Sequence, residues 1–127
     1  MSKKYIAYAG DTLTIEWYHD DSGKSGALHY FQKLPISQKK KLAHLFQLLA
    51  NIGTIRNEQK FRNEGDKIFA FKPAPDRFLC FFYEGGKVIV TNAFVKKTNK
   101  LPKREKEKAI KARQDYIKRC KRGTYYE

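Results

Sequence analysis

The chain is poor in the residues from which disulfide frameworks and metal sites are built. Its two cysteines, Cys80 and Cys120, form no Cys-x-x-Cys motif, and its three histidines have spacings that match no metal-binding motif. We therefore expect no metal, no cofactor and no disulfide. Cys80 lies in an apolar run and is expected to be buried, whereas Cys120 is expected to be an incidental exposed thiol. Packing or surface roles are expected for the histidines, His19, His29 and His44.

Long apolar runs, nucleophile signatures and nucleotide-binding motifs are missing from the sequence as well. No stretch approaches the roughly 20 apolar residues of a membrane span, and the N-terminal segment lacks the apolar centre of a signal peptide. No serine, threonine or cysteine has a nucleophile's activating signature, and Gly85-Gly86 is a turn signal rather than a phosphate-binding loop. These absences argue against membrane proteins, triad hydrolases and nucleotide triphosphatases, and they favour a cytoplasmic protein.

Negative charge is scarce, and this scarcity indicates the kind of partner. Against 13 Asp and Glu the chain has 27 Lys and Arg, which gives a formal net charge of +14 at pH 7. The cations are spread over expected strands, loops and helices, and the 14% of aromatic residues offer faces for base stacking. A nucleic-acid partner is therefore predicted for what its 127 residues indicate is a single domain, residues 1–127.

The clearest strand signals lie between residues 67 and 103. A short aromatic run, Ile68–Phe71, predicts a strand that ends before Pro73, and Arg77–Tyr83 predicts a central strand. The glycines of Glu84–Lys87 predict a tight hairpin turn into an antiparallel strand, Val88–Phe94. A period of two places Arg77, Leu79 and Phe81 on one face of the first hairpin strand. It also places four residues of the second strand together on one face, namely Val88, Val90, Asn92 and Phe94.

The flanking segments predict one further strand and three helices. Thr12–Tyr18 alternates as an amphipathic strand, and Ala27–Leu34 has helical spacing until Pro35. Ser37 is the expected N-cap of a second helix, which is closed by Gly53. Residues 54–66 are assigned no structure, and a charged helix with a narrow apolar stripe follows Pro102 over residues 103–118. The predicted order is β-α-α-β-β-β-α, and the stripe of the second helix is Leu42, Leu45, Phe46, Leu49 and Ile52.

This order, with basic residues at the last strands, is similar to the RelE superfamily of bacterial toxins, small ribonucleases that cleave messenger RNA on the ribosome. The run FVKKTNKLPKREKEKA, which begins at Phe94, resembles the HigB-like, phage-associated branch in particular. RFLCFFYEGGKVIV resembles the arginine-led aromatic strand, turn and apolar strand of that branch, with Arg77 at the arginine, and IFAFK resembles the strand before it. The residues of the first run that fall on the branch pattern are Lys96, Lys97, Thr98, Lys100, Pro102 and Glu105.

The resemblance implies a fold and a function. The fold would be α+β and RelE-like, with a twisted antiparallel sheet packed against the two N-terminal helices and a charged C-terminal helix. The protein would be the toxin of a type II toxin-antitoxin module, a metal-independent endoribonuclease that cleaves mRNA on the ribosome and inhibits translation. Its partner would be a cognate antitoxin, a helix-turn-helix protein.

The chain departs from the branch pattern at four positions. Ala70 and Lys72 stand where the branch commonly has a glutamate and an arginine, and Asn92 and Ala93 stand where it has a histidine and a glycine. Asn92 can hydrogen-bond a phosphate or a sugar, but it cannot act as an acid or a base. This departure keeps an alternative open, a non-catalytic RNA- or DNA-binding module on the same scaffold.

Cleavage of RNA without a metal uses the ribose 2′-OH as nucleophile, so the protein must stabilise the phosphate and move two protons. Arg77 is predicted to hold the phosphate, because a guanidinium donates two hydrogen bonds in parallel. Lys72, Lys96 and Lys97 are predicted to share this task, and a lysine among other cations has a lowered pKa, as a base requires. Tyr83 is a candidate proton donor or stacking surface. The remaining predicted RNA contacts are Asn92, Lys100 and Lys103.

Overall fold

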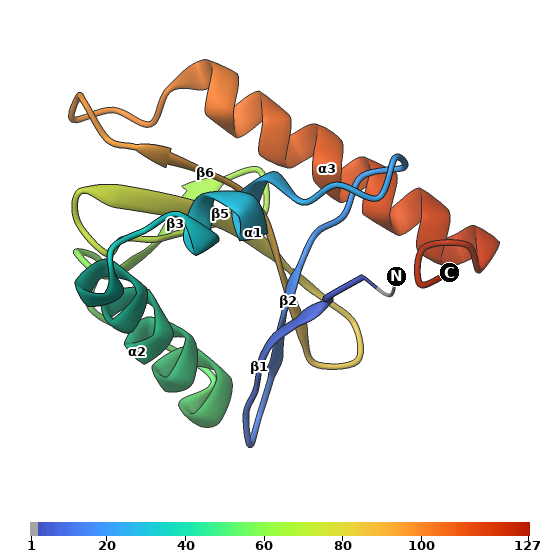
Figure 1. Ribbon diagram of the computed structural model, residues 1–127, viewed down its shortest axis with the longest axis horizontal. Coiled ribbons are helices and arrows are strands. Elements are labelled where there is room, and N and C mark those ends of the chain that lie inside the picture. The colour runs from blue at the N-terminus through green and yellow to red at the C-terminus, as the bar shows by residue number, and fades with distance from the viewer. Residues whose placement is uncertain (1–2) are drawn as a thin grey trace.

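The computed structural model describes residues 3–127, and one six-stranded sheet forms its centre (Figure 1). The order across the sheet is β1-β2-β6-β5-β4-β3. All neighbouring strands are antiparallel except β2 and β6, which are parallel. The α+β class is confirmed, whereas the expectation of a wholly antiparallel sheet is wrong at this one pair. The strands are β1 (Ile6–Ala9), β2 (Thr14–Trp17), β3 (Phe61–Gly65), β4 (Ile68–Phe71), β5 (Asp76–Tyr83) and β6 (Lys87–Val95).

Two strands were not expected from the sequence, and both lie at the edges of the sheet. β1 precedes the predicted first strand and pairs with β2. β3 lies inside residues 54–66, which were assigned no structure, and it pairs with β4. Most residues of β3 are exposed, so its sequence lacks the apolar alternation that reveals a strand. The observed order is therefore β-β-α-α-β-β-β-β-α rather than β-α-α-β-β-β-α.

The predicted hairpin is present, but a bulge changes which residues share a face. Gly85 and Gly86 form the turn with φ angles of 83° and 71°. Leu79 lies opposite Asn92 while Cys80 lies opposite Val90, so the residue between them, Thr91, has no partner. The expectation that Val88, Val90, Asn92 and Phe94 share one face is therefore wrong. Phe94 and Asn92 lie on the face of Arg77, Leu79 and Phe81, and the two valines lie on the other.

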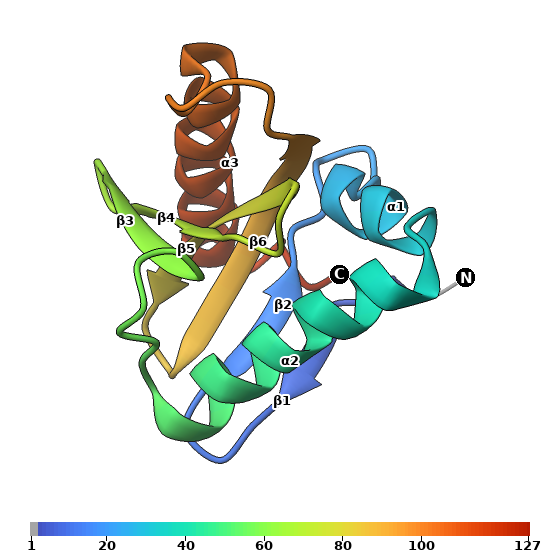
Figure 2. The ribbon, with the colours of Figure 1, turned by 90° about the vertical axis from the view of Figure 1, so that its left-hand side faces the viewer.

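Helices cover both faces of the sheet (Figure 2). α1 (Gly26–Gln32) and α2 (Ile36–Ile52) lie on one side, as predicted for the N-terminal helices, and α3 (Lys103–Arg122) lies on the other. α2 begins after Pro35, two residues earlier than a cap at Ser37 would allow, and is closed by Gly53 in the left-handed conformation. The predicted stripe of α2 is buried except at Ile52, which is 65% exposed.

The two faces have separate apolar cores. The core under α1 and α2 surrounds Trp17, Phe46 and Phe78, and it also contains the fully buried Cys80, as expected. The core under α3 surrounds Phe81 and Tyr116. Cys120 packs against this second core and is partly buried, so the expectation of an exposed thiol is wrong. Over residues 3–127, no helix combines the length and apolar composition that a membrane crossing requires.

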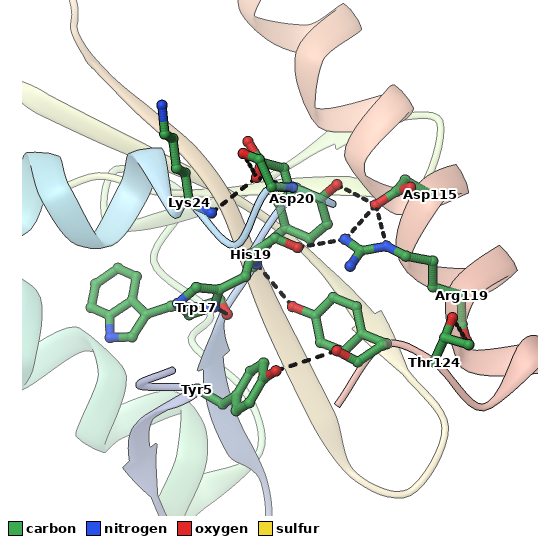
Figure 3. Close-up of polar contacts among 11 residues, drawn as sticks. Tyr5, Trp17, His19, Asp20, Lys24, Asp115, Arg119 and Thr124 are labelled. Carbon is green, nitrogen blue, oxygen red and sulfur yellow. Dashed lines mark hydrogen bonds and ion pairs between the residues drawn. The ribbon is translucent and has the colours of Figure 1, made fainter. Parts of the chain in front are cut away.

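A polar cluster fastens the end of α3 to the end of β2 (Figure 3). We call it the C-terminal junction, and it consists of Tyr18, His19, Asp115, Arg119 and Tyr125. Arg119 donates to Asp115 Oδ2 from Nε at 2.9 Å and from Nη2 at 2.6 Å, and it also donates to the carbonyl of His19. Tyr18 donates to the same carboxylate oxygen, and Tyr125 Oη accepts from His19 N at 2.9 Å. His19 is thus a packing residue, and the other two histidines are exposed, as expected.

Candidate nucleic-acid interface

A cavity of about 250 Å³ opens where β4 ends and β5 begins, and we call it the basic cavity. β3, β4, β5 and β6 each contribute to its wall, and the loop that leads into α3 closes one side. Ala70 and Phe94 are apolar parts of the lining. A single carboxylate, that of Glu64, is present in the wall. Five cations line the same space, namely Arg62, Lys72, Arg77, Lys96 and Lys100.

Arg77 is held in place through its backbone neighbour rather than through an ion pair. It is the second residue of β5, opposite Phe94, and its Nη1 donates to the carbonyl of Asp76 at 2.8 Å. The Asp76 carboxylate accepts instead from Tyr30 and from Gln38 Nε2, the latter at 2.7 Å. Burial lowers the pKa of Arg77, and the charges of Glu64 and Asp76 oppose this. Among residues 3–127 Arg77 makes no ion pair, so its outer donors can take an anionic ligand.

Lys72 directly follows the last residue of β4, at the start of the turn into β5. Its Nζ donates to the carbonyl of Glu58 at 2.9 Å. Burial lowers the pKa of Lys72, and the charges of Arg77, Lys96 and Arg62 lower it further. The expectation that a lysine among these cations has a lowered pKa is confirmed for Lys72.

Comparison with family models shows to which family the chain belongs. The model, described as phage-derived protein Gp49-like (DUF891), matches residues 29–114, which is more than half of the chain. The chain belongs to the Gp49-like family. This is a RelE-like, toxin-like family of phage-derived proteins, and the match extends from α1 through every wall of the basic cavity. A search of the curated proteins found no match.

In this Gp49-like protein the basic cavity brings together half of the predicted site. Lys72, Arg77, Lys96 and Lys100 all line it. Lys96 is positioned by its backbone N–H, which donates to the carbonyl of Pro75 at 2.9 Å and so ties the end of β6 to the β4–β5 turn. Lys97 and Lys103 are exposed on the two sides of the connecting loop and do not line the cavity.

The structure places the other two predicted residues, Asn92 and Tyr83, away from the basic cavity. Asn92 Nδ2 donates to Glu105 Oε1 at 3.0 Å and to the carbonyl of Glu105 at 3.1 Å, so it fastens the first turn of α3 to β6. Tyr83 lies six residues beyond Arg77 along β5, about 20 Å away at the rise of a strand. Its ring packs edge-to-face on Tyr116 with 4.9 Å between centroids.

Sequence reasoning missed the contribution of β3. Arg62 and Glu64 both come from this edge strand, whose polar sequence gave no apolar alternation. A local signal was present, because Gly65-Asp66 is a turn pair that stands one residue before the expected strand Ile68–Phe71. A hairpin interpretation of residues 61–71 would have placed both side chains beside Lys72. Among the described residues no group of three His, Cys, Asp or Glu side chains could hold a metal ion.

Proposed function

We propose that this Gp49-like protein is the toxin of a type II toxin-antitoxin module, of the HigB-like branch. In this proposal it cleaves messenger RNA on the ribosome as a metal-independent endoribonuclease and thereby inhibits translation in the cytoplasm. Its natural partner is a cognate helix-turn-helix antitoxin. The observation that carries the proposal is the basic cavity, where five cations surround a space of about 250 Å³. Two of them come from β3 and β5, and three come from the segments that follow β4 and β6.

The cavity suits a phosphodiester that gains charge during cleavage. Attack by the 2′-oxygen puts additional negative charge on the phosphate oxygens, and preorganised donors stabilise that charge most in a site shielded from water. Arg77 can donate two parallel hydrogen bonds to these oxygens, because its carboxylate neighbour, Asp76, is already occupied by Gln38 and Tyr30. Lys96 and Lys100 add charge that draws the RNA backbone into place. Lys72, with its lowered pKa, is available for proton transfer.

The test is to express the protein without a partner in a bacterial host, follow growth, and map new 5′ ends in the messenger RNA. We expect growth arrest with discrete new ends for the wild type, and neither for Arg77→Ala. Arg56→Ala is the matched control, because Arg56 is an exposed arginine outside the cavity. Normal growth and intact messenger RNA with soluble, folded wild-type protein would refute the ribonuclease proposal.

A second candidate function is a non-catalytic RNA- or DNA-binding module on the same scaffold. The observation that favours it is Asn92, whose amide cannot act as an acid or a base and donates a hydrogen bond to Glu105. A pure binder would retain nucleic acid on the basic cavity without cutting it. In that case Arg77→Ala would lower the affinity for RNA, and no new 5′ ends would appear with either protein.

A further inference from the structure

Glu64 is the one acidic side chain in the wall of the basic cavity, among five cations. A carboxylate next to a phosphate site weakens the binding of the phosphate, because like charges repel. Its presence there is therefore a cost for a protein that only binds RNA. It is useful for a protein that must also remove a proton from the RNA.

The local backbone gives Glu64 an unusual position in its strand. Asn63 lies opposite Phe69 and Gly65 lies opposite Ile68, so Glu64 is an additional residue without a partner on β4. Bulges of this kind redirect a side chain and occur often beside active sites. Asn63 Oδ1 accepts from the backbone N–H of Gly65 at 2.9 Å and holds the bulge. Ala70, which lies opposite Arg62 on β4, has a small side chain and also lines the cavity.

Glu64 also differs from the other acidic groups around the cavity, because those already have partners. Asp66 pairs with Lys106 at 2.9 Å, and Glu105 accepts from Asn92 at 3.0 Å. Among residues 3–127 Glu64 forms no ion pair and no side-chain hydrogen bond that would occupy its oxygens. Its half-buried carboxylate is thus free to accept a proton from a ligand in the cavity.

We propose that Glu64 is the catalytic proton acceptor for the ribose 2′-OH and that Lys72 is the proton donor to the leaving oxygen. The inference rests on the proposed ribonuclease function and assigns its two proton transfers. Glu64 removes the proton from the 2′-OH as the 2′-oxygen bonds to phosphorus, and Arg77 holds the phosphate oxygens. The bond between phosphorus and the 5′-oxygen then breaks, and the Lys72 ammonium protonates that oxygen.

The products follow from this balance of atoms. One RNA fragment ends in a 2′,3′-cyclic phosphate and the other begins with a 5′-hydroxyl, while Glu64 is left protonated and Lys72 neutral. Exchange of one proton between the two groups and solvent restores the starting state. Burial and then the charges of Arg77, Lys96 and Arg62 lower the pKa of Lys72, and the charge of Glu64 opposes them. An ammonium with a lowered pKa is a better proton donor.

The charged groups that face Glu64 are cations. These are Arg62 on its own strand, Lys72 and Arg77 from β4–β5, Lys96 and Lys100 after β6, together with Lys106 of α3 beside Gly65. Glu64→Gln keeps the size of the side chain among these cations but removes its ability to accept a proton.

The experiment compares Glu64→Gln with Glu107→Gln, a matched control whose exposed side chain on α3 lies outside the cavity. Single-turnover cleavage is measured on ribosomes programmed with a short messenger RNA. Binding is measured on the same RNA with a 2′-deoxy nucleotide at the cleaved position. We expect Glu64→Gln to cleave about 100-fold more slowly or worse, with binding equal to or tighter than that of the wild type. Glu107→Gln should behave as the wild type, and Glu64→Asp should regain part of the rate.

Two results would overturn the role of Glu64 and leave the ribonuclease proposal intact. One is cleavage by Glu64→Gln within about threefold of the wild type, and the other is an equal loss of binding and cleavage, which indicates a structural role. Should Glu64→Gln fold poorly, Glu64→Ala with and without added formate takes its place, and the absence of rescue in a folded protein overturns the role. If the wild type leaves the RNA intact, the proposed ribonuclease function itself is refuted. This outcome differs from the earlier ones, in which the wild type still cleaves the RNA.

Discussion

Arg77 and Arg119 are both partly buried arginines next to an aspartate, yet their surroundings are opposite. In the C-terminal junction Arg119 donates to Asp115 from two nitrogens, and its guanidinium lies 4.7 Å from the centroid of the Tyr125 ring. In the basic cavity Arg77 has only the carbonyl of Asp76, because the Asp76 carboxylate is bonded to Gln38 and Tyr30.

The electrostatic consequences are opposite too. Burial lowers the pKa of Arg119, but the hydrogen bond and charge of Asp115 outweigh burial and raise it above the ordinary value. At Arg77 burial dominates and the pKa is lowered. A cation that the fold leaves without a partner raises the free energy of the folded state, and a polyanion that binds there lowers it. The comparison therefore separates an arginine that joins two elements of the fold from one that has no ion pair among the described residues.

The largest expected effect is on cleavage by Arg77→Ala. Removing the donor of the phosphate should slow single-turnover cleavage by about 100-fold or more. The free energy of unfolding should stay within about 0.5 kcal/mol of the wild type, because the arginine has no ion pair to lose. Cleavage kinetics and urea unfolding on the same preparations measure both quantities. A large loss of stability in Arg77→Ala would remove the contrast with Arg119.

Arg119→Ala should show the reverse pattern. The change leaves the Asp115 carboxylate and the His19 carbonyl without their charged donor. We expect the free energy of unfolding to fall by about 2 kcal/mol in urea unfolding. Cleavage per folded molecule should be unchanged, with Arg122→Ala on the exposed end of α3 as the control. Loss of cleavage in fully folded Arg119→Ala would show that the two regions are coupled.

Acid should weaken the C-terminal junction through Asp115. Burial raises the pKa of Asp115, but hydrogen bonds from Arg119 and Tyr18 outweigh it, so its pKa lies below the ordinary value of 3.8. The stabilisation is present above that value and is lost as the pH falls through the lower folded pKa. In unfolding experiments from pH 6 to pH 2.5, wild-type stability should therefore fall more steeply than that of Asp115→Asn. Parallel curves would argue against the contribution of Asp115.

The smallest expected effect is at Lys100, which is exposed on the loop into α3. Lys100→Ala should weaken RNA binding a few-fold and reduce the slope of log affinity against log salt by about 0.7, since one phosphate contact is lost. Lys121→Ala, on the exposed last turn of α3, should leave that slope unchanged. Binding titrations at several salt concentrations measure the difference. Equal slopes for all three proteins would place the RNA elsewhere.

Local sequence patterns were sufficient to predict the strands and helices that have an apolar face. β4 was predicted with its observed bounds, β5 and β6 to within a residue at each end, and the start of α3 at Pro102 was also predicted. The parallel pairing of β2 with β6 joins segments about 70 residues apart in the chain, and no local pattern encodes it. No local pattern indicates the bulge at Thr91 either. Because of this bulge, Val88 and Val90 lie on the face of the sheet opposite to Asn92, and not on the same face as expected.

The same distinction applies to the candidate site. Arg77 and Lys72 flank a turn whose prolines are visible in the sequence, so their proximity could be predicted. Glu64 and Arg62 reach the cavity from a polar edge strand, and only the pairing of β3 with β4 brings them there. Asn92 was assigned to the site because it stands where the resembled branch has a histidine, and Tyr83 because a tyrosine can donate a proton or stack on a base. Their side chains are engaged with α3 instead.

The position of β6 between β2 and β5 has a consequence for the nascent chain. The β1–β2 hairpin is synthesised first, but its inner neighbour is the last strand to leave the ribosome. Until residues 87–95 have emerged, β2 has no partner on that side, and the wall of the cavity at Phe94 and Lys96 does not exist. Pairing of β2 and assembly of the cavity wall thus depend on the same segment, so neither is complete before β6 and the residues that follow it have left the ribosome.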